Sequence, residues 1–137
     1  KQDSAQMNDV LLKSVQLKAD DHATVLNDFF QTHSQDVVEA AKTIAEVYRE
    51  DGRLLTMGNG GSSCDAAHVA VEFQHPVTAG RPALTAINLT SDITMMTAVG
   101  NDIGFAHVYT RQVISQGRKG DCLIGLSTSG NSDNPVH

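Results

Sequence analysis

Residues 53–63, RLLTMGNGGSS, indicate the fold of this chain more clearly than any other stretch. The apolar run 53–57 predicts a buried strand, a polar glycine loop follows it, and residues 65–73 then have helical spacing. The alternation continues with further strands and helices, at 84–89 (strand), 92–99 (helix), 105–116 (helix) and 121–126 (strand). Strands that alternate with helices predict an α/β fold, a parallel sheet with helices on both faces.

The first third of the chain, upstream of this stretch, is predicted to be helical. Residues 4–32 contain no glycine or proline, and their apolar residues recur at three- and four-residue steps. Asp20 and Asp21 mark a candidate break, so one long helix and two shorter helices both fit. Ser34 is a candidate N-cap of a further helix, which Gly52 ends.

The chain is therefore expected to have two parts. Residues 1–51 form N-terminal helices that pack on the core or on a neighbouring subunit, and residues 52–137 form the sheet domain. The sequence begins with lysine and ends just after a glycine-rich turn. We expect the sheet domain to be the first part of a larger one, with its C-terminal part missing from this sequence.

Composition excludes several classes of protein. The 137 residues are 40% hydrophobic and 19% charged, which predicts a folded chain with a real core. A formal net charge of −6 argues against a nucleic-acid partner, because such binding needs a clustered basic face. No stretch approaches about 18 uninterrupted apolar residues, so we expect no membrane span. Cys64 and Cys122 form neither a disulfide framework nor a CxxC pair, which favours a reduced, cytoplasmic setting.

Two of the predicted strands end in small polar loops, at 58–63 and at 127–132. In open α/β sheets, ligands bind beyond the carboxyl ends of the strands. The second loop, STSGNS, supplies four hydroxyls and one glycine, which suits a phosphate monoester. An ordinary strand-to-helix turn with a serine N-cap fits the same residues.

Other loop motifs fail on details. The first loop lacks the third glycine of a dinucleotide-binding fingerprint, and no GxxxxGK[ST] phosphate loop occurs. Residues 125–129, GLSTS, come near the GxSxG nucleophile elbow but have serine in the last position. These reaction classes are therefore not expected.

His68 and Glu72 are four residues apart on a predicted helix, so their side chains share one face. An imidazole and a carboxylate at this spacing can bind one divalent metal, zinc by preference, or can transfer protons. A solvated surface pair has the same spacing, and two ligands do not complete a zinc site. Asp65 either orients His68 or is a helix-start acid. Cys64 is expected to be a buried structural thiol, and five histidines have no comparable context: His22, His33, His75, His107 and His137.

The motifs, taken in order, resemble the phosphoheptose isomerase family, whose members have a sugar-isomerase (SIS) domain. The motifs are GNGGS at 58–62, CDAAH at 64–68, Glu72, GNDxGF at 100–105, GD at 120–121 and STSGNS at 127–132. The resemblance implies a flavodoxin-like sheet with extra N-terminal helices. It also implies a homotetramer with its sites at subunit interfaces.

The resemblance implies a role for individual residues of this sequence. His68 and Glu72 match the zinc ligands of the family, and Glu72 also matches its catalytic acid/base carboxylate. The remaining zinc ligands, a glutamine and a histidine on a later helix, are expected beyond residue 137. The residues that match the substrate-binding loops and turn are Asn59, Gly60, Gly61, Asn101, Asp102, Ser127, Thr128, Ser129 and Ser132, together with Glu72.

The implied reaction converts the ketose sedoheptulose 7-phosphate to the aldose D-glycero-D-manno-heptose 7-phosphate through an enediol. Glu72 is expected to be the base that moves a proton from carbon 1 to carbon 2. Zinc held by His68 would polarise the carbonyl group. Isomerisation of another sugar phosphate and a non-catalytic regulatory or scaffold role are the alternatives.

Overall fold

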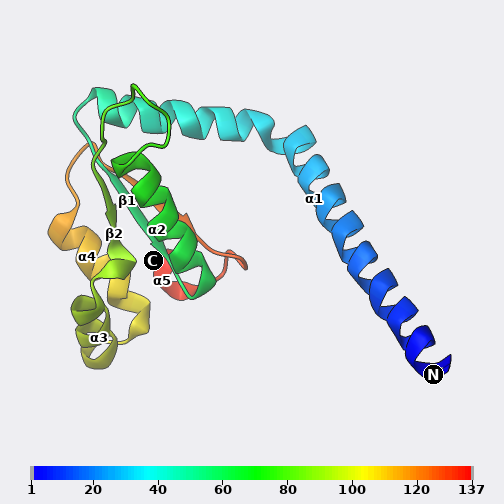
Figure 1. Cartoon of the computed structure of the whole chain (residues 1–137). Coiled ribbons are helices and arrows are strands. Elements are labelled where there is room, and N and C mark those ends of the chain that lie inside the picture. The colour runs from blue at the N-terminus through cyan, green and yellow to red at the C-terminus, as the bar shows by residue number, and fades with distance from the viewer. Residues whose placement is uncertain (1, 137) are drawn as a thin grey trace. The chain divides into compact units, whose positions relative to one another are not determined.

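The computed structural model describes residues 2–136, so His137 lies outside the described residues (Figure 1). The chain forms two compact units, residues 1–42 and residues 43–137. Helix α1 (Gln2–Arg49) is one continuous α-helix, which decides between the two N-terminal arrangements that the sequence allowed. Residues 2–49 contain neither glycine nor proline, so nothing in them interrupts the helix.

Ser34 is not an N-cap, as the sequence suggested, because it lies inside α1. Its hydroxyl donates to the carbonyl oxygen of Phe30, one turn earlier, instead of capping a free helix end. Every side chain from residue 5 to residue 42 is exposed. The exposed large apolar side chains of this unit are Met7, Val10, Leu11, Leu12, Val15, Leu17, Val25, Leu26, Phe29, Phe30, Val37 and Val38.

The second unit is built on a parallel sheet of three strands, as predicted. Strands β1 (Leu54–Gly58), β2 (Ala86–Asn88) and β3 (Cys122–Leu126) lie in the order β2-β1-β3. Leu54 pairs with Ala86 on one side and with Cys122 on the other. The predicted strand 84–89 is shorter in the structure, because the backbone N–H of residue 84 donates to the carbonyl of residue 73 instead of joining the sheet.

Helices cover both faces of the sheet, also as predicted (Figure 1). Helix α2 (Gly61–Gln74) packs on one face, where Leu54 contacts Ala70 and Ala86. Helices α3 (Ile93–Asp102) and α4 (Val108–Gln116) lie on the other face, over Leu55 and Met57. Successive residues of β1 point to opposite faces, so a strand buried on both sides is mostly apolar. Its one polar side chain, Thr56, is buried and donates to the carbonyl oxygen of Ala66 at 2.8 Å.

Three short helical elements complete the described part of this unit. They are η1 (Leu89–Ser91), η2 (Phe105–His107) and α5 (Asp133–Val136). The predicted helix 105–116 is thus divided into η2 and α4. The helix expected at 92–99 is longer in the structure, because α3 continues through residues 100–102, whose composition is typical of a turn. Asp92 caps the start of α3 by accepting a hydrogen bond from the N–H of Met95.

An ion pair joins the amino ends of β1 and β3. Arg53 Nη2 donates to Asp121 Oδ2 at 2.6 Å, and the two side chains are only 16% and 8% exposed. The Asp121 carboxylate also accepts the backbone N–H groups of Arg53 and Arg118, each at 2.9 Å. These bonds, that of the Arg53 side chain above all, lower the pKa of Asp121 below its ordinary value.

No helix among residues 2–136 combines the length and the hydropathy that a membrane span requires.

Candidate functional site

The two polar glycine loops meet at the carboxyl edge of the sheet. The first loop follows β1 and leads into α2, and the second follows β3, the neighbour of β1. A Cβ on Gly58 would overlap the carbonyl oxygen of Ser62, so only glycine lets α2 begin this close to the strand. Gly60, which precedes α2, has a positive φ of 53°.

A cavity of about 150 Å³ lies between these loops, and we call it the loop cavity. It brings together five of the predicted substrate-binding residues with Ser62 and Leu126. The predicted residues that line it are Asn59, Ser127, Thr128, Ser129 and Ser132.

Every side chain that lines the loop cavity is uncharged. Ser127 Oγ accepts the N–H of Gly130 at 3.1 Å, and Ser129 Oγ accepts the N–H of Asn131 at 3.2 Å. A hydroxyl can accept and donate at the same time, so each serine keeps its own proton for a ligand. The cavity can therefore bind an anion through hydroxyl donors without a cationic side chain.

The other predicted substrate-binding residues lie outside the loop cavity. Gly60 and Gly61 are exposed at the start of α2. Asn101 and Asp102 are exposed in the last turn of α3, where Asn101 Nδ2 donates to Asp102 Oδ1 at 2.9 Å. The structure thus places Asn59 next to residues 127–132, which we call the hydroxyl loop, and these four residues lie outside the loop cavity.

His68 and Glu72 form the pair that their spacing predicts. His68 Nε2 lies 3.2 Å from Glu72 Oε1, and the side chains are 72% and 47% exposed. They line an open cavity of about 360 Å³ on the surface of α2, which we call the helix cavity. Asp65 lines it too, but the hydrogen-bond partner of His68 is Glu72. Cys64, at the start of the same helix, is exposed, so the expectation of a buried thiol is wrong.

The residues present do not by themselves complete a metal site. Within residues 2–136, no group of three His, Cys, Asp or Glu side chains comes together to hold a metal ion. His68 and Glu72 supply two ligands, whereas zinc takes three or four protein ligands. The chemistry of the pair suits zinc, but its coordination needs further donors.

The loop cavity and the helix cavity share no lining residue. Ser62, in the first turn of α2, lines the loop cavity, whereas Glu72 lies near the other end of that helix. Ten residues of α-helix separate them, which is about 15 Å along the helix axis. The first turn of α2 therefore lines the loop cavity, and the His68–Glu72 pair lines a different cavity.

Two residues that the sequence analysis did not select contact Asn59, which lines the loop cavity. The Tyr109 hydroxyl lies 3.1 Å from Asn59 Oδ1, and Asn134 exchanges two hydrogen bonds with the Asn59 amide. The sequence offered only an asparagine two residues after STSGNS and a tyrosine in a predicted helix. Neither pattern by itself indicates a contact with a loop 50 or 75 residues away.

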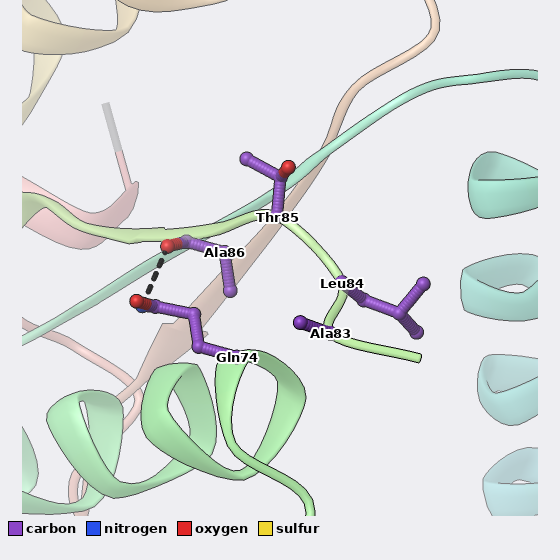
Figure 2. Close-up of a pocket in the computed structure, with 5 residues that line it drawn as sticks. All are labelled: Gln74, Ala83, Leu84, Thr85 and Ala86. Carbon is purple, nitrogen blue, oxygen red and sulfur yellow. Dashed lines mark hydrogen bonds between the residues drawn. The ribbon is translucent and has the colours of Figure 1, made fainter. Parts of the chain in front are cut away.

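A further cavity, of about 320 Å³, contains no residue that the sequence analysis selected for the site (Figure 2). It is lined by Gln74 and by residues 83–86, and Gln74 Nε2 donates to the carbonyl oxygen of Ala86 at 2.9 Å. These residues lie where β2 begins. The cavity is therefore at the amino edge of the sheet, away from the carboxyl edge where ligands bind in such folds.

Comparison with known proteins places this arrangement among relatives. The chain is 44% identical over 128 residues to the phosphoheptose isomerase of Desulfovibrio desulfuricans, which covers 93% of this chain and 61% of the relative. It is 45% identical over 102 residues to that of Neisseria meningitidis, covering 74% of this chain and 52% of the relative. The chain thus spans about three fifths or less of the length of these curated relatives.

Solved structures give the same result for the fold. Phosphoheptose isomerase GmhA from Neisseria gonorrhoeae matches with a TM-score of 0.84 and 38% identity, over 92% of this chain and 65% of that one. A phosphoheptose isomerase from Francisella tularensis matches with a TM-score of 0.66 and 33% identity, over 80% and 63%. The family model of the SIS domain matches residues 19–137. The chain therefore belongs to the SIS domain family.

Proposed function

We propose that this protein is a sugar-phosphate aldose–ketose isomerase that converts sedoheptulose 7-phosphate to D-glycero-D-manno-heptose 7-phosphate. The observation that carries the proposal is the loop cavity, where the hydroxyls of residues 127–132 meet Asn59 at the carboxyl edge of the sheet. The phosphoheptose isomerases with which this chain shares 44% and 45% identity support the choice of substrate.

The phosphate group of the substrate occupies the loop cavity in this proposal. Ser127, Thr128, Ser129 and Ser132 donate their hydroxyl protons to its oxygens. A chain with a net charge of −6 repels anions at a distance, so binding depends on such local donors. Neutral donors also avoid burying a cation that is left unpaired when the site is empty.

Glu72 is the proposed base. Its carboxylate is 47% exposed and can be reached from the helix cavity. It takes a proton from carbon 1, and the electron pair of that C–H bond forms the double bond of the enediol. The carbonyl oxygen on carbon 2 becomes a hydroxyl by taking a proton from a second acid/base group, which we propose lies outside the described residues. Return of the proton to carbon 2, with loss of the hydroxyl proton on carbon 1, gives the aldose.

His68 and Glu72 are proposed to hold zinc together with donors outside the described residues. Zinc at this place would polarise the carbonyl group and stabilise the negative charge of the enediolate. A carboxylate that binds zinc is a weaker base, so Glu72 has two proposed roles that only separate measurements of metal binding and turnover distinguish.

The proposed assembly is a homotetramer with its sites at subunit interfaces. The first unit exposes twelve large apolar side chains along α1, an apolar surface that contact with neighbouring subunits would bury. The distance of about 15 Å along α2 between the loop cavity and Glu72 also favours a site completed by a second chain. We further propose a cytoplasmic location, which suits the free thiols of Cys64 and Cys122.

Binding and turnover test the proposal separately. Calorimetric titration with sedoheptulose 7-phosphate should show binding that Ser129→Ala weakens about fivefold or more, the effect of one lost hydrogen bond. Turnover to the aldose should occur in the wild type and disappear in Glu72→Gln, while Glu50→Gln, an exposed glutamate outside the site, retains it.

Each contrary result has its own meaning. Binding without turnover would support the non-catalytic alternative, and turnover of a different sugar phosphate would support the other isomerase. Near-native turnover in a folded Glu72→Gln protein would refute the role of Glu72. Unchanged affinity in Ser129→Ala would refute the role of the hydroxyl loop.

A further inference from the structure

Asn59 is the one residue of the first loop, besides Ser62, that lines the loop cavity, and its amide is held by two buried residues. Asn59 Nδ2 donates to Asn134 Oδ1 at 2.6 Å, and Asn134 Nδ2 donates to Asn59 Oδ1 at 2.8 Å. The Tyr109 hydroxyl lies 3.1 Å from the same Asn59 oxygen. Tyr109 and Asn134 are only 1% and 4% exposed.

These three residues come from three different elements. Asn59 follows β1, Tyr109 is in α4, and Asn134 is in α5, directly after the hydroxyl loop. The Tyr109 hydroxyl has a single proton, which two acceptors share: the carbonyl oxygen of Gly58 at 2.6 Å and, more weakly, Asn59 Oδ1. The network therefore joins the first loop to the backbone that follows the second loop, across the two sides of the cavity.

The hydrogen-bonding capacity of Asn59 is almost fully used by the protein. A primary amide has two N–H donors and an oxygen that accepts two bonds. Asn134 takes one N–H, and the oxygen contacts both Asn134 and Tyr109. One N–H remains, on a side chain that lines the loop cavity and cannot rotate without breaking these bonds. The network thus leaves a single fixed donor for a ligand.

We propose that Asn134 and Tyr109 are positioning residues of the phosphate-binding site. They hold the amide of Asn59 in one orientation and keep the two loops at the spacing that a phosphate monoester requires. The inference rests on the proposed function, and names residues of the same site that act through Asn59 without touching the ligand.

Tyr109→Phe tests the inference, since it removes one oxygen atom and keeps the buried ring. Tyr48→Phe is the matched control, because the Tyr48 hydroxyl also donates to a carbonyl oxygen, that of Thr85 at 2.9 Å, at the opposite edge of the sheet. Both variants should lose thermal stability, Tyr109→Phe the more, because its hydroxyl bonds a buried carbonyl oxygen. Only Tyr109→Phe should weaken the binding of inorganic phosphate and of sedoheptulose 7-phosphate, by about fivefold.

A double-mutant cycle shows whether Asn134 acts through Asn59. Asn59→Ala and Asn134→Ala should each weaken phosphate binding, and the double variant should bind no more weakly than Asn59→Ala alone. Additive losses in the cycle, or equal phosphate affinity in Tyr109→Phe and Tyr48→Phe, would overturn the positioning role.

These measurements also separate this inference from the proposed function. If the wild type binds phosphate and the variants behave as expected but no sugar phosphate is turned over, the positioning role stands and the isomerase proposal fails. If turnover occurs and the variants bind phosphate as the wild type does, the isomerase proposal stands and the positioning role fails. A wild type that binds neither inorganic phosphate nor the sugar phosphate overturns both.

Discussion

Replacement of Asp121 by asparagine is the sharpest test of how the sheet is held together. Each carboxylate oxygen accepts two hydrogen bonds. Oδ1 accepts from the backbone N–H of Arg53 at 2.9 Å and from its Nε at 3.3 Å. Oδ2 accepts from Arg53 Nη2 at 2.6 Å and from the backbone N–H of Arg118 at 2.9 Å. Whichever way the new amide turns, its NH₂ group faces two donors.

The size of the effect follows from burial. Arg53 and Asp121 are 16% and 8% exposed, so the variant leaves a largely buried guanidinium without its counter-charge. Loss of one partner of a buried ion pair costs about 3–5 kcal/mol. The residual exposure of Arg53 places the expected loss near the lower end, about 3 kcal/mol. With a urea dependence of about 2 kcal/mol per molar, the unfolding midpoint should fall by about 1.5 M.

The pH dependence has a definite sign. Hydrogen bonds from Arg53 lower the pKa of Asp121 in the folded chain below its ordinary value. Such a group stabilises the fold fully above its unfolded pKa, and the stabilisation is lost as pH falls through the folded pKa. The difference between wild type and Asp121→Asn should therefore be constant from about pH 7 to about pH 5 and should shrink below about pH 4.

Urea titration followed by tyrosine fluorescence measures the stability difference between wild type and variant. The signal reports on residues 43–137, because both tyrosines of the chain, Tyr48 and Tyr109, lie there. Asp28→Asn, at an exposed position of α1, serves as the control and should leave the midpoint unchanged. A midpoint for Asp121→Asn within about 0.3 M of the wild type would refute the reasoning, since it corresponds to less than about 1 kcal/mol. So would a difference that persists in full at about pH 2.

Two further variants probe the carboxyl edge and the helix cavity. Gly58→Ala should lower the free energy of unfolding in urea by about 2 kcal/mol, because the added Cβ overlaps the Ser62 carbonyl. Gly61→Ala should leave that free energy unchanged, because the space around the added Cβ is open. Equal losses in the two variants would contradict this account. His68→Ala should reduce zinc affinity in equilibrium dialysis at least about tenfold, while the exposed His75→Ala leaves it unchanged. Equal zinc affinity in both histidine variants would remove His68 from the proposed metal site.

The sequence was informative wherever a pattern is local. The apolar runs predicted the three parallel strands, and the alternation with helices predicted the covering of both faces of the sheet. Glycine and small polar residues after β1 and β3 predicted two loops at one edge of the sheet, which the structure places side by side around a cavity. The four-residue spacing of His68 and Glu72 was enough to predict their contact.

Where local patterns failed, a distant or competing contact was responsible. Ser34 has the chemistry of an N-cap, but a helix that continues through it offers the Phe30 carbonyl instead. Residues 100–102 have the composition of a turn, but α3 continues through them to Asp102. Helical spacing indicated that His68 lies on one face of a helix. It could not indicate that only the first turn of that helix lines the loop cavity, so that His68 lines a different cavity.

Two contacts that the sequence could not reveal lie at opposite ends of β1 and β3. At the amino end, Arg53 and Asp121 are 68 residues apart in sequence, and at the carboxyl end Asn59 and Asn134 are 75 residues apart. The parallel order of the sheet brings both pairs together, and a five-residue strand keeps the two ends about 16 Å apart. Asp121 is therefore too far from the loop cavity to affect a ligand directly, whereas Asn134 contacts a residue that lines it. Substitution of Asp121 should thus lower stability and leave phosphate affinity intact in the folded protein, and substitution of Asn134 should change the affinity itself.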